Sequence, residues 1–262
     1  MTKQPSVRFL FLVFSLMAGQ SIYAADLKMR IVWEGELPKV KMTDKADSKE
    51  CGGVDLNTER QFVDAETNGV RHAVVYVAPP RGERERWRQP HRKETIRIDV
   101  CHCRIQPHIS IAQTGNRLKV DERDGSTGHN LNFSFFENAP IGANIVAKGE
   151  RLRDLIASEP APIPIECNVH PWERGYLFVL DHAFIGKSGK AGNLVIRGLP
   201  DDSDVPLRMF HELGSIHSVI IRGERRQLER GRFSVRVSGA VTDLGKVVID
   251  AQSFAKTDAE DR

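Results

Sequence analysis

Short apolar segments recur along the chain, and many of them alternate with polar residues at a period of two. The alternation is clearest at residues 95–100 and 233–237, and it is typical of a strand with one face in the core and one in water. Turn-forming Gly, Pro, Asn and Asp separate the segments. Strands are predicted at residues 29–33, 73–77, 95–100, 108–111, 117–121, 131–136, 163–167, 176–180, 194–197, 207–211, 217–221, 233–237 and 246–249. Many short strands between turns indicate an all-β sandwich.

Two segments depart from the strand pattern. Leu152, Leu155 and Ile156 are spaced as on one face of a helix, which predicts a helical turn over residues 150–158. Residues 79–97 carry seven Lys or Arg against three Asp or Glu. We expect an exposed loop there whose charges are solvated, and a docking surface for an anionic partner is the alternative.

The first residues have the pattern of a secretory signal. Lys3 and Arg8 precede an apolar run over residues 9–18, and small residues follow around Ala24. We expect cleavage after Ala24, so that residues 1–24 are a signal peptide and the protein is periplasmic or secreted. An uncleaved anchor or a buried helix is the alternative. The run is shorter than the roughly 20 apolar residues that span a bilayer, and no later stretch is apolar enough to cross a membrane.

Charge and motif content exclude several classes of function. The chain has 38 Lys and Arg against 35 Asp and Glu, a net charge of +3. Nucleic-acid binders usually show a much larger basic excess, so no nucleic-acid partner is expected. The sequence also lacks a Gly-x-Ser-x-Gly nucleophile elbow, a phosphate-binding Gly-x-x-x-x-Gly-Lys and a His-Glu-x-x-His zinc helix. None of these enzyme classes is therefore indicated.

Three potential metal ligands lie in the middle of the chain. His129 opens a predicted strand, Cys167 ends another, and His170 follows in a short loop. A thiolate with two imidazoles is the ligand set of mononuclear copper electron-transfer sites, which a weak axial ligand usually completes. Zinc sites use Cys-x-x-His as well. The alternative without a metal is a buried thiol beside two hydrogen-bonded histidines.

Longer motifs surround these residues, among them Gly-His129-Asn-Leu-Asn and Cys167-Asn-Val-His-Pro-Trp172. Together they resemble the cupredoxins, and specifically the secreted methylamine-utilisation-like cupredoxin proteins of planctomycetes and related bacteria. The similarity extends over residues 103–110, 128–132, 162–172, 175–182, 196–200, 210–212 and 230–245. The resemblance implies a Greek-key β-sandwich that binds one copper ion, Cu(I) or Cu(II), through His129, Cys167 and His170.

Glu173 stands where the resembled family usually has an axial Met. A carboxylate is a harder ligand than a thioether, so as fourth ligand it would favour Cu(II) and lower the reduction potential. Glu173 could instead suit zinc, face solvent, or leave a coordination position open. Asn130 and Trp172 adjoin the ligands in sequence and are candidates to contact them.

The resemblance also implies a disulfide between Cys51 and Cys103, because the family has a cysteine at each of these places. Cys101 shares a strand face with Cys103 by the period of two, so pairing of Cys51 with Cys101 is the alternative. The same alternation puts His102 on the opposite face, which argues against a metal cluster at residues 101–103. His182 and His211 are expected to be hydrogen-bonded strand residues, with a role beside the metal or in docking as the alternative.

The expected organisation is a signal peptide at 1–24, a cupredoxin-like domain at 25–182, a C-terminal β extension at 183–255 and a tail at 256–262. The extension is expected to be transthyretin-like or regulatory-like, or to belong to the same sandwich. We predict a mononuclear copper protein that exchanges single electrons with an unknown redox partner, and an electron carrier is favoured over an enzyme. The alternatives are a binding or structural sandwich without copper, and a copper enzyme or chaperone with an open site.

Overall fold

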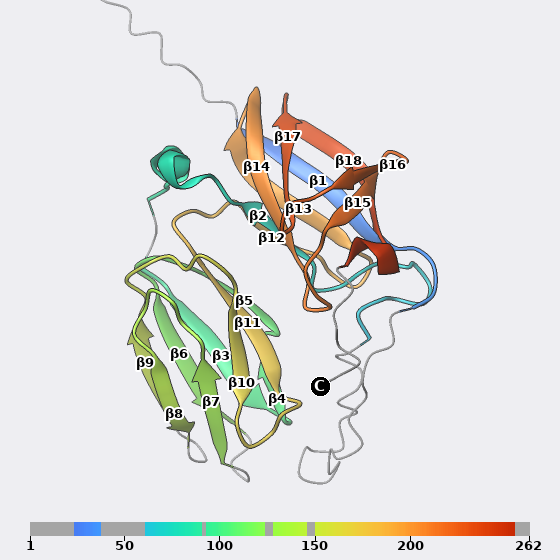
Figure 1. The fold of residues 1–262 in the computed structure, drawn as a ribbon. Coiled ribbons are helices and arrows are strands. Elements are labelled where there is room, and N and C mark those ends of the chain that lie inside the picture. Colours follow the sequence, from blue (N-terminus) through green and yellow to red (C-terminus); the bar gives the residue numbers. More distant parts are fainter. Residues whose placement is uncertain (1–23, 38–60, 91–92, 124–127, 146–149, 255–262) are drawn as a thin grey trace, which may run out of the picture.

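The computed structural model describes residues 24–37, 61–90, 93–123, 128–145 and 150–254, and only the backbone of residues 141–145, 150 and 151. Strands dominate this part of the chain (Figure 1). They are β1 (Ala24–Trp33), β2 (Val74–Val77), β3 (Thr95–Cys101), β4 (Arg104–Gln106), β5 (Ile109–Gln113), β6 (Arg117–Glu122), β7 (His129–Phe133), β8 (Ile141–Ile145), β9 (Glu150–Asp154), β10 (Ile163–Cys167), β11 (Arg174–Leu180), β12 (Ile185–Lys187), β13 (Asn193–Pro200), β14 (Ser203–Phe210), β15 (Ser218–Ile221), β16 (Glu224–Gln227), β17 (Arg232–Val237) and β18 (Val241–Ile249). The helical elements are η2 (Arg81–Glu83), α1 (Arg84–Trp87) and η3 (Ala251–Ser253). The prediction of an all-β fold is confirmed.

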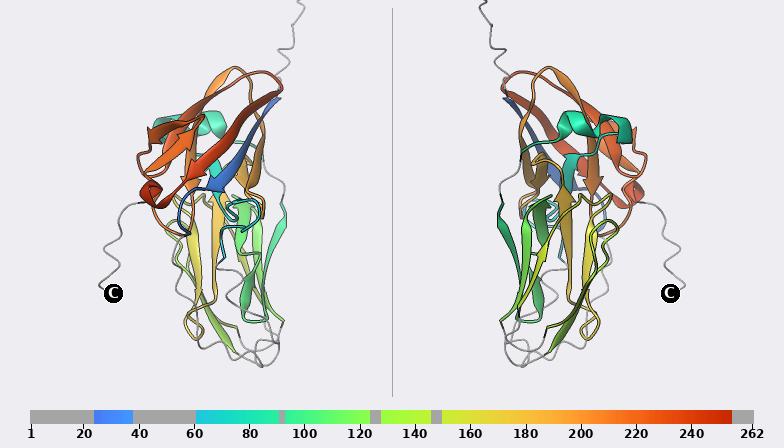
Figure 2. Two further views of the ribbon diagram at one scale, coloured as in Figure 1. Left: turned by 90° about the vertical axis from the view of Figure 1, so that its right-hand side faces the viewer. Right: turned by 90° about the vertical axis from the view of Figure 1, so that its left-hand side faces the viewer.

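The strands form four sheets that pack as two sandwiches. The terminal sandwich joins a sheet of order β13-β1-β18-β15-β16 to a sheet of order β12-β2-β14-β17. The central sandwich joins a sheet of order β5-β11-β10-β7-β8 to a sheet of order β4-β3-β6-β9. Within the central sandwich the chain crosses repeatedly between the two sheets, as Greek-key sandwiches do. The two sandwiches follow one another along the long axis of the molecule (Figure 2).

The terminal sandwich combines strands from both ends of the described chain. β1 pairs antiparallel with β13 and parallel with β18, so it lies inside the sheet and not at its edge. Its alternation turns Leu27, Met29 and Ile31 into the core, where they meet Val247 and Ile249 of β18. Apolar side chains of this kind each contribute roughly 1.5–3 kcal/mol when fully buried.

This pairing differs from the expected division at residue 182. β1 and β2 fall within the range 25–182, yet β1 pairs with β13 and β18, and β2 pairs with β12 and β14. The C-terminal strands therefore complete a sandwich with β1 and β2, while β3 to β11 make the central sandwich. Alternation shows which face of a strand is buried, but it does not show which strand lies beside it.

The thirteen predicted strand segments all overlap observed strands. The predicted helical turn over residues 150–158 is wrong, because residues 150–154 form β9, which pairs antiparallel with β6. Leu155 is buried, but Leu152 and Ile156 are exposed, so the three apolar residues do not share one face. Three apolar positions without helix caps are outweighed by the hydrogen bonds that β6 offers.

The basic segment 79–97 is more ordered than the predicted exposed loop. Residues 81–87 form η2 and α1, and Trp87 is only 1% exposed. The Trp87 ring meets Phe184 edge to face at 6.0 Å, which anchors the short helix to the terminal sandwich. The arginines of α1 remain exposed around this anchor.

The two sandwiches touch through a third, smaller apolar cluster. Tyr76 of β2 packs against Phe178 of β11, and Phe210 of β14 meets Tyr176 with ring centroids 4.9 Å apart. At the edge of this cluster His108 Nε2 lies 2.5 Å from Glu212 Oε1. The cluster therefore ties β5 and β11 of the central sandwich to β2 and β14 of the terminal sandwich.

Some expectations fall outside the described residues, namely the signal peptide up to residue 23, Cys51 and the tail at 256–262. Among the described residues, no helix is long and apolar enough to cross a membrane. Cys101 is not in a disulfide, whereas Cys103 is buried and is not among the reduced cysteines of the described residues. Cys103 thus stays the expected partner of Cys51, and their disulfide stays a prediction.

Close approach of two backbones gives a test of the terminal sandwich. Gly192 has a φ of +80°, and a Cβ there would lie 2.0 Å from the carbonyl oxygen of Ile31. We expect Gly192→Ala to lower the free energy of unfolding by at least about 2 kcal/mol, through both steric clash and backbone strain. Urea denaturation measures this loss. Gly189→Ala is the matched control in the same turn, since a Cβ there meets open space. Equal stability of the two variants would contradict the close approach.

Candidate metal centre

The four candidate ligands lie on or beside three neighbouring strands of the central sandwich. His129 is the first residue of β7, Cys167 is the last residue of β10, and Glu173 directly precedes β11. β10 pairs antiparallel with both β7 and β11. Antiparallel neighbours run in opposite directions. The start of β7, the end of β10 and the start of β11 therefore lie at the same end of the sheet. The fold thus brings together residues that are far apart in the chain.

The loop between β10 and β11 is closed by two backbone hydrogen bonds. The N–H of Glu173 donates to the carbonyl of His170 (2.9 Å), and the N–H of Cys167 donates to the carbonyl of Glu173 (3.2 Å). These bonds make a compact turn in which positions 167, 170 and 173 approach one another. Three of the four candidate side chains therefore come from one short, hydrogen-bonded loop.

The donor atoms converge on one point. One ligand atom from each of His129, Cys167, His170 and Glu173 lies within 4.8 Å of all the others. The Nδ1 atoms of His129 and His170 are 3.3 Å apart, and each faces one oxygen of Glu173, at 2.9 Å and 3.3 Å respectively. The Cys167 Sγ lies 3.6 Å from His170 Nδ1. Two imidazole nitrogens that face one another and share a carboxylate are arranged as ligands of a common ion.

Burial sets the electrostatics of this cluster. Glu173 is 1% exposed, His129 and Cys167 are also buried, and His170 is partly exposed. The Glu173 Oε1 atom accepts no hydrogen bond from the described part of the chain. Its contact with His170 Nδ1 at 3.3 Å lacks hydrogen-bond geometry, which is costly for a buried carboxylate oxygen, and an ion bound at the site is one of the ordinary explanations. The donor set and this oxygen therefore fit a bound metal ion.

The metal-free cluster also perturbs a histidine. Burial lowers the pKa of His129, but hydrogen bonds and charge interactions with Cys167 and Glu173 outweigh burial and raise it to about 10. An imidazolium in this position supplies the positive charge that the buried thiol and carboxylate attract. A metal cation at the same point would replace that proton, since His must be neutral to act as a ligand.

Glu122 is a neighbour of the site that our sequence reasoning missed. It is buried at the end of β6, and its Oε1 lies 4.0 Å from His129 Nε2. The signal was present in the alternation of β6, which places Glu122 on the same inward face as Leu118 and Val120. A carboxylate on the core side of a strand is unusual, and it marks a polar environment within the core.

Asn130 and Trp172 lie beside the cluster. The Asn168 side chain donates from Nδ2 to Asn130 Oδ1 (2.8 Å), and the Asn168 N–H donates to the Asn130 carbonyl (2.8 Å). These bonds fasten the ligand loop to β7. The Trp172 ring packs at 5.2 Å from the ring of His170. Both residues thus restrain the segments that carry the candidate ligands.

His182 and His211 lie outside this cluster and are satisfied by hydrogen bonds within the terminal half of the molecule. The His182 Nε2 donates to the carbonyl of Val77, and the His211 Nε2 donates to the carbonyl of Arg71, both over 3.1 Å. In each ring Nδ1 accepts a backbone N–H two residues further on. The expectation of hydrogen-bonded histidines is confirmed, and neither ring belongs to the candidate metal centre.

Comparison with known proteins gives little beyond this geometry. No protein-family model and no curated protein matches the chain. Among solved structures, a single-residue variant of amicyanin in the Cu(I) form is 17% identical, with 32% of this chain and 81% of that one covered and a TM-score of 0.29. A copper-containing nitrite reductase from Thermus scotoductus SA-01 is 10% identical, with 35% and 23% covered and a TM-score of 0.28. At these TM-scores the likeness carries no argument about function.

Acid should destabilise the protein through the two buried neutral histidines. Burial lowers the pKa of both His182 and His211 to about 4, whereas unfolded histidines titrate near 6.5. The unfolded chain therefore binds protons first, so the contribution of these two histidines to the free energy of unfolding is full above pH 6.5 and is lost as the pH drops towards 4, by up to about 3 kcal/mol for each histidine.

Urea denaturation of the metal-free protein at several pH values measures this slope. His211→Gln should flatten it, while His102→Gln, at an exposed position, should leave it unchanged. A His211→Gln variant with the full slope would show that His211 does not contribute.

Proposed function

We propose that the chain is a cupredoxin-type protein that binds one copper ion through His129, Cys167 and His170, with Glu173 as the axial ligand, and transfers single electrons. One observation carries the proposal: a thiol, two imidazoles and a carboxylate, three of them buried, converge within 4.8 Å at one end of the sheet. Soft thiolate with imidazole is the donor set of copper electron-transfer centres. Zinc accepts the same residue types and is the competing ion.

Each candidate ligand has a distinct part in this proposal. Bound copper would supply the one-electron chemistry. Cys167 would provide a thiolate, and the two imidazoles would hold a geometry that suits both oxidation states. Glu173 would add negative charge, which stabilises the more highly charged oxidation state and so lowers the reduction potential. The burial of Glu173 argues against its facing solvent.

The surroundings of the ligands favour a rigid centre. Ladder hydrogen bonds hold β7 with His129 and β10 with Cys167, a backbone hydrogen bond from Cys167 holds Glu173, and Asn168 ties the ligand loop to Asn130. Rigid ligands move little when the charge of the centre changes, which keeps the barrier to electron transfer small. His170 is the partly exposed ligand and the natural point of exit for an electron. A periplasmic or secreted location and a redox partner protein belong to the same proposal.

Copper titration of the full chain tests the site. We expect a charge-transfer band in visible absorption that saturates at one copper per chain, with a matching Cu(II) signal in electron paramagnetic resonance. Cys167→Ser should abolish the band, because the thiolate supplies it. Cys101→Ser removes the other free cysteine of the described chain and should leave the band intact.

The competing functions predict different results. A sandwich that has lost copper would show no band and no change in stability on copper addition. A zinc protein would hold one zinc ion per chain as isolated, whether or not added copper can replace it. An open copper enzyme or chaperone would show a band that azide perturbs. If the band were lost in Cys101→Ser and retained in Cys167→Ser, the assignment of Cys167 as the thiolate ligand would be wrong.

Replacing the carboxylate tests the axial position. Glu173→Met should raise the reduction potential by at least about 59 mV, a tenfold change in the Cu(II)/Cu(I) preference, because a neutral thioether replaces an anion. Cyclic voltammetry measures the potential. Glu166→Met is the control, since Glu166 lies on β10 next to Cys167 but is exposed. Equal potentials in the wild type and Glu173→Met would remove Glu173 from the ligand set.

A further inference from the structure

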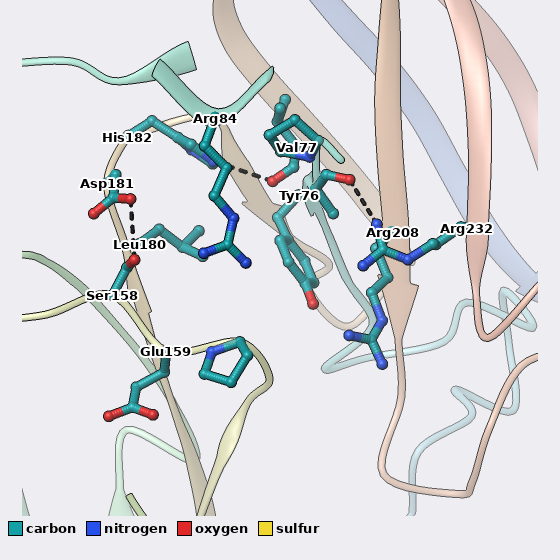
Figure 3. A pocket seen from close by; sticks show the side chains of 13 residues that line it. Tyr76, Val77, Arg84, Ser158, Glu159, Leu180, Asp181, His182, Arg208 and Arg232 are labelled. Atoms are coloured by element: carbon teal, nitrogen blue, oxygen red, sulfur yellow. Dashed lines mark hydrogen bonds between the residues drawn. The ribbon is translucent and has the colours of Figure 1, made fainter. Parts of the chain in front are cut away.

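A pocket lies where the two sandwiches meet, away from the candidate metal centre. The terminal sandwich contributes Tyr76 of β2, Arg208 of β14 and Arg232 of β17, and α1 contributes Arg84. The central sandwich contributes the loop before β10 and the end of β11 at Leu180. All of these side chains line the pocket, and Figure 3 shows the Tyr76 ring with the Arg84 side chain on one side of it and the Arg208 side chain on the other. We name this the arginine pocket.

The three arginines have few partners of their own. Arg232 donates from Nη1 to the carbonyl of Ala78 (2.7 Å), and Arg208 donates from Nε to the carbonyl of Arg230 (3.2 Å). Neither they nor Arg84 pair with a carboxylate within the described part of the chain. Each guanidinium has five N–H donors, so most donors in the pocket remain available.

The two acidic residues that border the pocket are already engaged. Glu159 is buried and accepts backbone N–H bonds from residues 136, 137 and 138, and Figure 3 shows its carboxylate turned away from the arginines. Asp181 accepts hydroxyl bonds from Thr114 (2.9 Å) and Ser158 (3.0 Å). The positive charge of three arginines is thus left without a counter-anion from these neighbours.

Tyr76 adds a neutral donor to the pocket. Burial raises the pKa of Tyr76, although Arg208 and Arg232 act in the opposite direction. The Arg208 guanidinium lies close enough to the Tyr76 hydroxyl to favour its ionised form, and the O–H of the neutral phenol is available to donate. His182 also borders the pocket but is neutral at pH 7 and adds no charge.

Size narrows the class of ligand. The pocket has a volume of about 60 Å³, several times the roughly 10–15 Å³ that one water molecule needs. That volume suits a compact oxyanion. A single carboxylate is planar and is satisfied by one guanidinium fork, whereas three guanidiniums from three elements suit the several oxygen pairs of a tetrahedral phosphate.

We propose that the arginine pocket binds a phosphate group, either as inorganic phosphate or as a small phosphate ester. Arg84, Arg208 and Arg232 donate to its oxygens, and the Tyr76 hydroxyl adds one further donor. All four donors come from α1, β2, β14 and β17, so bound phosphate would tie α1 to the sheet of the terminal sandwich. The proposal does not depend on copper, because β10 separates the pocket from Cys167 by roughly 13 Å of strand.

Calorimetric titration of the full chain with inorganic phosphate tests this inference, with sodium chloride as the ionic-strength control. We expect saturable binding at one site per chain and a rise in Tm with phosphate, since a ligand of the folded state stabilises it. Arg208→Gln and Arg84→Gln should each weaken binding at least about tenfold, the loss of a charge-assisted hydrogen bond. Arg84→Lys keeps the charge and should fall between Arg84→Gln and the wild type.

Arg226→Gln makes the same change of charge on the exposed strand β16 and should leave the affinity within about twofold. Cys167→Ser should also bind phosphate normally, so failure of the metal proposal is distinguished from failure of this one. Phenyl phosphate is the second probe: tighter binding than phosphate assigns the pocket to esters, and equal or weaker binding assigns it to free phosphate. No saturable binding of either probe, or equal weakening in Arg226→Gln and Arg208→Gln, would overturn the proposal.

Discussion

The hydrogen-bonded ladder of β7, β10 and β11 is the constraint on which the candidate metal centre depends. Antiparallel pairing places the start of β7, the end of β10 and the start of β11 at one end of the sheet, so backbone geometry positions His129, Cys167 and Glu173. Two hydrogen bonds within the connecting loop then bring His170 to the same point. Burying a carboxylate and two imidazoles without a cation costs free energy. The ladder places these groups around one point, where a single cation can interact with all of them.

The three nitrogen and sulfur donors could be proposed from their spacing together with the family resemblance. A Cys and a His three positions apart can face the same side of a tight loop, and a distant histidine at a strand start can join them. Glu173 was less predictable, since its sequence position allowed a ligand, a solvated carboxylate or an open position. Only the packing of the loop shows that it is buried between the two imidazoles. Glu122 was missed because one carboxylate among 35 acidic residues attracts no notice until its strand face is considered.

For the fold, the local sequence pattern predicted most of the strands but did not predict which strands pair with one another. Alternation found the strands that build both cores, because burying one face of a strand leaves a period of two in the sequence. It overlooked short strands such as β4 and β12, and β9, where Leu152 faces solvent. The basic segment was predicted wrongly for a related reason. Most of its residues are charged, but the one buried side chain, Trp87, holds the short helix against the sandwich. Pairing partners are set by the whole core, which no single segment records.

The position of β1 has a consequence for how the chain assembles. Asp26 pairs with Val241 and Trp33 pairs with Ile249, so a strand made early in synthesis stays without its parallel neighbour until almost all the described chain has been made. Contacts of such large sequence separation are costly in loop entropy and slow to form. The central sandwich has its own core from β3 to β11 and carries no such delay. We therefore expect assembly from the middle outwards, with the half that holds the candidate metal ligands becoming ordered before the half made from the two ends of the described chain.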